Sequence, residues 1–390
     1  DGMLEPLGQS QVLAYLKRLA NGRRIHLISF EKADDWANVA ERVRLARDIA
    51  SAGIAWHPLR YHKAPSVLAT AFDIMQGIIV GVWLCVRYKI KIIHARSYIP
   101  SVIALTLKKL FNVKYIFDMR GFWADERIDG GLWPKGGRIY RVAKWFEKRF
   151  LLSADSVVSL TNAAVDEMKK FDYLQGRLPN FKVITTCTDL NLFDFKKNNI
   201  NNSSKESFVL GYVGSVGVWY LFDETLNCFK LILEKVPSAQ LHIINRGGHQ
   251  YIRERLIDKR INPNKVMIET SDHAGVAKAM QSMDVGIFFI KPVYSKMSSA
   301  PTKLGEFLGC GIPCLSNTKV GDMAVILNDE KVGVALDSFD ETSMKLGIEE
   351  LMTLLSDPEI RERCRSTALK YFSLDIGVRS YNHIYNRLIS

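Results

Sequence analysis

Strand-like and helix-like segments alternate along almost the whole chain, and this alternation limits the possible folds more than any other feature. Short apolar runs such as 156–160 are followed by longer segments with helical periodicity such as 162–171. A chain of this kind forms parallel sheets whose strands are joined by helices. The sequence therefore predicts an α/β protein built from doubly wound, Rossmann-like sheets.

The alternation is interrupted clearly at residues 196–206 (KKNNINNSSKE), where Ile200 is the only apolar residue. Polar stretches of this composition are typical of linkers. A chain of 390 residues also exceeds the size at which a single core usually stops growing. We therefore expect an N-terminal domain over 1–195, a linker over 196–206 and a C-terminal domain over 207–372, with a long helical tail at the end.

Residues 67–86 form an apolar run that approaches the length needed to span a bilayer. Asp73 and Gln76 interrupt it, and a basic strand over 89–94 follows directly. We interpret 66–88 as a helix buried against a sheet rather than as a membrane span.

A formal net charge of +12 points to anionic partners such as nucleotide phosphates or acidic lipids. Nucleic acid is disfavoured as a partner because the basic residues are scattered and no nucleic-acid-binding motif is present. The six cysteines lie mostly on apolar segments without a C-x-x-C pair, which indicates buried, reduced thiols. The protein is therefore expected to be cytoplasmic.

A glycine-rich turn, Gly211-Tyr-Val-Gly-Ser-Val-Gly217, joins an expected strand to an expected helix. Glycines at such a turn let the backbone approach a pyrophosphate, and the helix N-terminus supplies N–H donors. Gly214, Ser215 and Gly217 are the resulting candidates for phosphate binding. The alternative is a tight turn that needs glycine only for its backbone conformation.

The segment Ser299–Pro313 (SAPTKLGEFLGCGIP) is a more specific signal. Pro301 suits the first turn of a helix, which places Thr302 and Lys303 where a bound phosphate would be held. Glu306, one turn later, can face the same way and accept hydrogen bonds from ribose hydroxyls. The alternative is an ordinary surface Lys–Glu pair.

From this segment outward the chain resembles the family-4 retaining glycosyltransferases of the GT-B fold, over nearly its whole length. The likeness is carried by the following segments: 1–11 (DGMLEPLGQSQ), 93–96 (IHAR), 118–127 (DMRGFWADER), 187–193 (CTDLNLF) and 301–313. The resemblance implies two Rossmann-like domains facing an interdomain cleft, and sugar transfer from a nucleoside diphosphate sugar. It also implies that the last helix, about 373–390, crosses back to the first domain.

The chain departs from the family at several positions. Many members carry two glutamates separated by seven residues; the second matches Glu306, whereas Ser298 occupies the first position. The Arg and Lys usual in the first loop of the second domain are absent, since Ser215 and Trp219–Tyr220 occupy that region. Arg246 and Lys303 are then the best cations for the diphosphate, and we expect both to act in catalysis.

The first domain supplies a second set of candidates just past its expected strands. Asp118 and Arg120 are expected to act in catalysis, and Asp118 stands where family members often have His. Residues expected to position the acceptor or the donor sugar are His94, Arg96, Asp125 and Glu126. The alternative for these residues is an internal ion-pair network or, for His94, a structural hydrogen bond.

The segment 137–152 is expected to form an amphipathic helix with Arg138, Arg141, Lys144 and Lys148 on one side and Ile139, Val142, Phe146 and Phe150 on the other. A basic face near anionic lipid would suit a lipid-linked acceptor. This would place the protein peripherally at the inner face of the membrane. The alternative is an ordinary solvated face.

The sequence contains no Asp-x-Asp triplet, which metal-dependent transferases use to hold a cation on the diphosphate. We therefore expect no metal and no cofactor, with the nucleotide sugar as donor and a glycan or lipid-linked acceptor. Family resemblance implies that the acceptor attacks on the face the leaving group vacates. The rival hypotheses are a GT-B nucleotide-sugar epimerase and a non-catalytic GT-B scaffold or regulatory subunit.

The chain opens at Asp1 on the loop before the first expected helix, 9–20. In a doubly wound domain that loop follows the first strand, in the middle of the sheet. We therefore expect the natural protein to carry an apolar strand of about six to eight residues upstream. Gly8 would then lie in the cleft near the donor.

Overall fold

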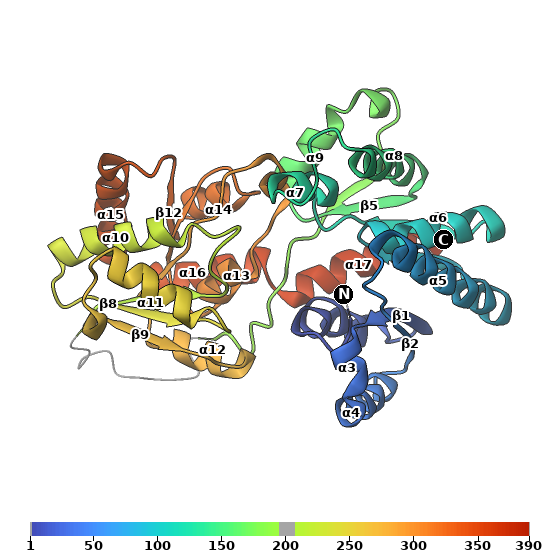
Figure 1. Ribbon diagram of the computed structural model, residues 1–390, viewed down its shortest axis with the longest axis horizontal. Helices are drawn as coiled ribbons and strands as arrows, with labels where there is room; N and C mark the ends of the chain where they lie inside the picture. Colours follow the sequence, from blue (N-terminus) through green and yellow to red (C-terminus); the bar gives the residue numbers. More distant parts are fainter. Residues whose placement is uncertain (1, 195–206, 390) are drawn as a thin grey trace. The chain divides into compact units, whose positions relative to one another are not determined.

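The computed structural model describes residues 2–194 and 207–389, and the chain divides into two compact units (Figure 1). Unit 1 comprises Asp1–Ile128, Trp133–Thr185 and Leu374–Ser390, and unit 2 comprises Asp129–Leu132 and Thr186–Ser373. The short piece Asp129–Leu132 belongs to unit 2, where the Asp129 carboxylate accepts a hydrogen bond from the Ser295 N–H at 2.9 Å. The expected linker over 196–206 lies outside the described residues.

Unit 1 has parallel strands connected by helices. Its strands are β1 (Ile25–Glu31), β2 (Ile54–Arg60), β3 (Ile92–Arg96), β4 (Lys114–Asp118), β5 (Ser156–Ser159) and β6 (Phe181–Val183). Its helices are α1 (Pro6–Gly8), the π-helix η1 (Gln9–Leu13), α2 (Ala14–Leu19), α3 (Ala33–Ala37), α4 (Val39–Ser51), α5 (Ser66–Tyr88), α6 (Tyr98–Phe111), α7 (Trp123–Asp129), α8 (Arg138–Ser153), α9 (Asn162–Lys169), the 3₁₀ turn η2 (Asp172–Leu174) and α17 (Leu374–Ile389).

The sheet of unit 1 is in two pieces. β1 pairs with β2, and β3, β4, β5 and β6 pair in that order, but within the described residues no ladder joins β1 to β3. Strands β1 and β3 are largely half-buried, whereas β4 and β5 are buried along almost their full length. A continuous sheet, which would contradict the expected strand order, is not observed. The upstream strand itself stays a prediction.

Unit 2 has one parallel sheet in the order β12-β11-β10-β7-β8-β9. Its strands are β7 (Val209–Val213), β8 (Gln240–Ile244), β9 (Val266–Glu269), β10 (Val285–Ile287), β11 (Cys314–Asn317) and β12 (Gly333–Leu336). Its helices are α10 (Phe222–Lys235), α11 (His249–Asp258), η5 (Pro263–Lys265), α12 (His273–Met280), η6 (Tyr294–Ser298), α13 (Thr302–Gly309), α14 (Met323–Asp329), α15 (Glu341–Leu355) and α16 (Ile360–Tyr371).

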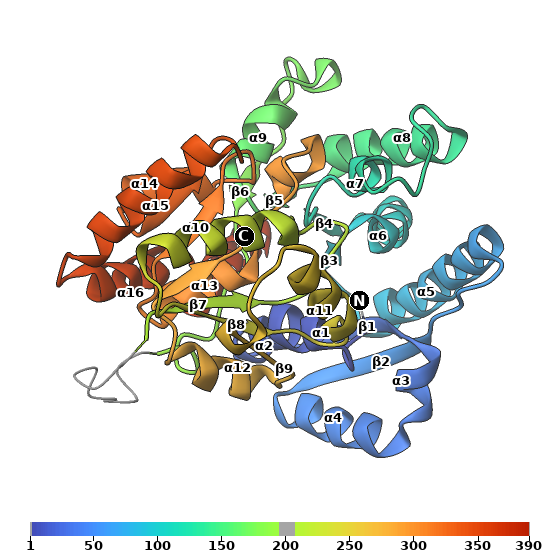
Figure 2. The ribbon, with the colours of Figure 1, turned by 60° about the vertical axis from the view of Figure 1, so that its left-hand side comes forward.

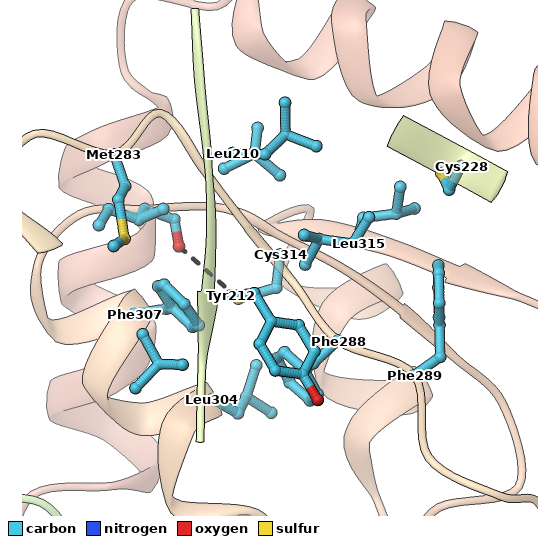
Figure 3. Close-up of a cluster of buried hydrophobic side chains, with 14 of the residues drawn as sticks. Leu210, Tyr212, Cys228, Met283, Phe288, Phe289, Leu304, Phe307, Cys314 and Leu315 are labelled. Atoms are coloured by element: carbon cyan, nitrogen blue, oxygen red, sulfur yellow. Dashed lines mark hydrogen bonds between the residues drawn. The ribbon is translucent and has the colours of Figure 1, made fainter. Parts of the chain in front are cut away.

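The core of unit 2 fixes the position of α13 against the sheet (Figure 3). Phe288 follows β10 and stacks on Phe307 of α13, with ring centroids 6.3 Å apart and planes 8° apart. A Cβ at Gly286 would lie 2.6 Å from the Phe307 ring, so only glycine allows this close approach. This contact holds α13 against the sheet next to the end of β10.

Helix α5 has the expected bounds, but the expectation that it is buried is wrong for one of its faces. Its buried residues include Asp73, Gly77, Gly81 and Leu84. Only 28% of its most apolar 18-residue window is buried, and this is the helix in the described residues whose length and composition would suit a membrane span. One face packs on the domain and the other is exposed.

The C-terminal helix α17 belongs to unit 1, where it packs on α2 and β3. Arg23 holds it by donating to Asn382 and Asn386, at 2.6 Å each. The return of the last helix to the first domain is therefore as expected. The expected long helical tail is interrupted by β12, an edge strand of the second sheet.

Candidate functional site

Lys303 lies at the start of α13, and its ammonium group is the most unusual feature of unit 2. The residue is 5% exposed, and its Nζ has no hydrogen-bond partner among the described residues. The Nζ instead lies 3.8 Å from the ring centroid of Tyr220 and 5.4 Å from that of Tyr212. A buried cation with no anion beside it is costly unless a ligand supplies the negative charge.

Burial lowers the pKa of the Lys303 ammonium from its ordinary value to about 7, and Glu306 opposes this shift. Desolvation disfavours the charged form, and no carboxylate is close enough to offset it fully. A diphosphate beside Lys303 would raise the pKa again. A lysine whose pKa lies this close to neutrality can gain a proton when an anion binds beside it.

The glycine-rich turn after β7 lies directly against this lysine. Gly214 has φ +116°, and a Cβ there would lie 2.8 Å from the Lys303 Nζ. The Tyr212 hydroxyl donates to the Ser215 carbonyl at 2.7 Å, which shapes the turn, while the Ser215 side chain is exposed. Gly217 also has a positive φ, of 85°. Gly214 is therefore required both for its backbone conformation and for the space it leaves Lys303.

Asn245, at the end of β8, connects this turn to the next loop. Its side chain donates to the Gly214 carbonyl at 2.8 Å and accepts from the Gly248 N–H at 2.6 Å. Sequence analysis missed Asn245, although its position just past a strand end was the available signal. Arg246 is exposed in the same loop.

The segment after Gly217 supplies the aromatic rings over two lysines. The Trp219 carbonyl accepts from the Lys291 N–H at 2.9 Å, and Tyr220 forms a bridge with Ile290. Tyr220 covers Lys303, and the Lys296 Nζ lies 3.8 Å from the Trp219 ring centroid. These aromatic residues stand where the family pattern has cations, and sequence reasoning did not assign them a role.

Glu306 lies one turn after Lys303 and is 14% exposed in its side chain. Its Oε1 lies 3.7 Å from Nε2 of His273 on α12, and the Glu306 carboxylate raises the pKa of His273. Thr302, the first residue of α13, is half-buried beside them. Ser298, at the position of the missing glutamate, is buried and donates to the Ser295 carbonyl at 2.6 Å.

The candidates in unit 1 form a network between β3, β4 and α17. Asp118 is 2% exposed; its Oδ2 accepts from the Tyr381 hydroxyl at 2.9 Å and lies 3.3 Å from Nε2 of His94. The other ring nitrogen of His94 lies 2.7 Å from the Tyr385 hydroxyl. Arg96 is 3.8 Å from the same carboxylate oxygen. Despite burial, these partners and nearby Arg120 hold the pKa of Asp118 well below its usual value.

Asp125 belongs to a different cluster, on α7 and α8. Its carboxylate accepts from the Tyr140 hydroxyl at 2.8 Å and from Lys144 at 3.0 Å. Lys144 also pairs with the fully buried Glu147 at 2.5 Å, so its expected place on a solvent-facing basic side of the helix is wrong. Glu126 is half-buried on α7.

Gly8 is buried at the end of α1 in unit 1, where a Cβ would lie 2.0 Å from the Gly2 carbonyl oxygen. The structure thus brings Lys303, Gly214 and Glu306 together in unit 2, and His94, Arg96 and Asp118 together in unit 1. The unit 2 residues follow the carboxyl ends of β7, β8 and β10, the edge at which doubly wound sheets bind ligands. The fold is that of a doubly wound α/β protein, with its candidate site at the carboxyl edge of the second sheet.

Family comparisons identify the class further. The model of the family described as "Glycosyl transferases group 1" matches residues 193–371, and that described as "Glycosyl transferase 4-like domain" matches residues 11–177. The chain belongs to the group 1, family-4 type glycosyltransferases and is a glycosyltransferase enzyme. No curated protein sequence matches it.

Solved structures share the GT-B fold at low sequence identity. Sucrose-phosphate synthase from Thermosynechococcus elongatus matches with 14% identity and a TM-score of 0.67, over 94% of this chain and 99% of the other. A glycosyltransferase from Rickettsia africae matches with 13% identity and a TM-score of 0.69, over 94% and 99%. Anabaena HepE, solved with UDP-glucose, matches with 14% identity and a TM-score of 0.66, over 99% and 98%.

Proposed function

We propose that this enzyme is a retaining glycosyltransferase that moves a sugar from a nucleoside diphosphate sugar to a glycan or lipid-linked acceptor in polysaccharide or glycoconjugate biosynthesis. The observation that carries the proposal is the buried ammonium of Lys303 beside Gly214, with no anion to pair with it. A diphosphate supplies the missing negative charge. The similarity to HepE, whose structures contain UDP and UDP-glucose, supports this class of donor.

In the proposed reaction the bond between the anomeric carbon and the diphosphate oxygen breaks, and charge grows on the leaving phosphate. Lys303 and the backbone N–H groups of the 214–217 turn stabilise that charge, with Thr302 at the helix start and Arg246 at the rim. Glu306 accepts hydrogen bonds from the ribose. The acceptor oxygen bonds to the anomeric carbon on the face that the phosphate leaves and gives its proton to the departing phosphate oxygen. Because cationic side chains neutralise the phosphate in this proposal, it includes neither metal nor cofactor.

The first domain is proposed to bind the acceptor. Asp118 and Arg120 would position the acceptor or the donor sugar there, and Gly8 is proposed as a further donor-binding residue. The buried network of His94, Arg96 and Asp118 holds the ends of β3 and β4 in shape, and through it these residues would position the bound sugar. A cytoplasmic location, peripheral at a membrane through 137–152, completes the proposal.

The proposal is tested by screening nucleotide sugars for thermal stabilisation and then for sugar transfer. Ligand at about a hundredfold excess over its Kd should stabilise the folded protein by about 2.7 kcal/mol. A donor that stabilises the protein should then be consumed only when an acceptor is present. Donor turnover without acceptor would indicate the epimerase, and absence of binding to any donor would indicate a non-catalytic scaffold.

A further inference from the structure

Helix α5 exposes an apolar ridge along one side for most of its length. The ridge consists of Leu68, Phe72, Met75, Ile79, Trp83 and Val86, which are between 42% and 70% exposed. Their spacing of three or four residues places them on one face of a helix. From Leu68 to Val86 the ridge is about 27 Å long at 1.5 Å per residue. Soluble surfaces carry scattered apolar residues, but a continuous stripe of this length indicates a binding surface.

The opposite face of α5 is committed to unit 1. A Cβ at Gly77 would come within 2.3 Å of the end of the Ile103 side chain, and one at Gly81 within 2.5 Å of the end of Leu107, both on α6. Asp73 is 3% exposed and accepts from the His62 N–H at 3.0 Å. These contacts hold α5 against α6, beside which it lies in both views (Figures 1 and 2). Because the inner face of α5 makes these contacts, the exposed ridge can lie along a membrane surface over its whole length. Crossing a bilayer would break the contacts between α5 and unit 1.

Helix α6 lies between α5 and α8 and contacts both. On α8 the exposed residues are a mixture of apolar and basic side chains: Arg138, Ile139, Arg141, Val142, Trp145, Lys148 and Arg149. Arg138, Arg141, Val142, Trp145 and Phe146 line one surface hollow there, about 700 Å³ in volume. Near the end of α6, the basic side chain of Lys109 and the apolar side chain of Leu110 are also exposed.

Exposed carboxylates are absent from all three helices. The acid of α5, Asp73, is buried, as is the acid of α8, Glu147, and α6 has none. Exposed basic residues flank the ridge at both ends: Arg60, Lys63, Arg87, Lys89 and Lys91. An apolar ridge with a purely cationic rim matches an anionic lipid surface, because the ridge enters the acyl boundary while the rim meets the head groups.

We propose that α5 lies in the plane of an anionic membrane, with the Leu68–Val86 ridge inserted at the head-group boundary. The basic residues at both ends of α5 contact the lipid head groups. This surface is independent of the proposed donor site, and it differs from a contact through 137–152 alone because insertion of apolar side chains supplies affinity that salt does not screen.

The test is cosedimentation with vesicles that contain about a third phosphatidylglycerol in phosphatidylcholine, at low and high salt. The full chain should bind, and Ile79→Asp with Val86→Asp should weaken binding at least about tenfold at both salt concentrations. The matched control is Val325→Asp with Leu346→Asp, because these residues of unit 2 are 60% and 61% exposed, close to Ile79 at 61% and Val86 at 66%. The control variant should bind like the unmodified chain.

Equal vesicle binding by both double variants would overturn the proposal and leave only an electrostatic contact. Light scattering without vesicles tests a second copy of the chain as the occupant: a dimer that only the α5 variant dissociates would also overturn it. Nucleoside diphosphate should stabilise both variants against heating as it does the unmodified chain. That measurement separates a failure of the membrane surface from a failure of the proposed function.

Discussion

Lys303 is held in its folded position at an energetic cost, since an ammonium group removed from water without a hydrogen-bond partner is unfavourable. The rings of Tyr220 and Tyr212 recover part of this cost through cation–π contacts. An unpaired charge of this kind contributes little to folding. In the proposed function, a bound anion offsets the remaining cost.

Replacing Lys303 with Ala should weaken nucleoside diphosphate binding ten- to a hundredfold, about 1.5–3 kcal/mol for a charge-assisted hydrogen bond. Thermal stability should be unchanged or higher, because the substitution removes a desolvated charge. Isothermal calorimetry measures the affinity. Lys278→Ala, an exposed lysine on α12 of the same unit, is the control and should have no effect. Unchanged affinity in Lys303→Ala would remove this residue from the site.

Nucleoside diphosphate binding should take up protons above neutral pH. With a pKa of about 7, Lys303 is mostly neutral at pH 8 in the free protein, and a bound diphosphate would restore its charge. The expected uptake is roughly 0.9 proton at pH 8. The diphosphate is itself deprotonated there, so it adds little. Calorimetry in buffers of different ionisation enthalpy measures the uptake, and Lys303→Met should abolish it.

The lowered pKa of Lys303 also makes the free energy of unfolding depend on pH. The folded-state pKa of Lys303, about 7, lies below the ordinary lysine value. Between these values the unfolded chain binds the extra proton, so the contribution of this group to the free energy of unfolding rises as pH increases through about 7. Below pH 7 the burial cost is fully present in the ligand-free protein.

Substituting Glu306 with Gln should lower the affinity for the nucleoside portion of the donor, including free nucleoside diphosphate. A neutral amide is a weaker acceptor for ribose hydroxyls than a carboxylate. The pKa of His273 should also fall, because the raised value depends on Glu306. Calorimetry and NMR titration of His273 follow the two effects. Full nucleotide affinity in this variant would place Glu306 outside the ribose site.

At the scale of elements, the Asp118 network connects two strands of unit 1 to the C-terminal helix. Tyr381 and Tyr385 of α17 contact Asp118 and His94 at the ends of β4 and β3. The carboxylate is buried among partners that favour its charged form. The network therefore contributes to holding α17 on the first unit.

Asp118→Ala should destabilise the protein by about 3–5 kcal/mol, the usual cost of removing one partner of a buried charge pair. Because the folded-state pKa of Asp118 is depressed, this stabilisation is present above the ordinary aspartate pKa and is lost as pH falls below it. Denaturant unfolding of the unmodified chain and the Asp118→Ala variant, at neutral and acidic pH, measures the loss of stability and its dependence on pH. The control Asp166→Ala, at an exposed ion pair with Lys169, should cost less than about 1 kcal/mol. A neutral effect of Asp118→Ala on stability, with lost transfer, would instead favour a direct role in the reaction.

At the scale of the whole molecule, chelation of divalent metal should leave sugar transfer intact. The expectation rests on the absence of an Asp-x-Asp triplet and on cationic side chains at the proposed diphosphate site. Transfer is measured after treatment with EDTA and again after adding Mg²⁺ or Mn²⁺. Loss of transfer that either metal restores would contradict the assignment of Lys303 as the group that neutralises the diphosphate.

The sequence by itself determined the α/β class and the bounds of α5 and β4, whereas anion binding by the segment from Thr302 to Glu306 stays a prediction. These features depend on local periodicity and on residues a few positions apart, so a short stretch of sequence contains the information that predicts them. Tertiary structure alone decided that Trp219 and Tyr220 cover the lysines, and that Lys144 is paired inside the protein. It also decided which face of α5 is exposed. Each of these depends on contacts between segments distant in the chain, and periodicity contains no information on which segments meet.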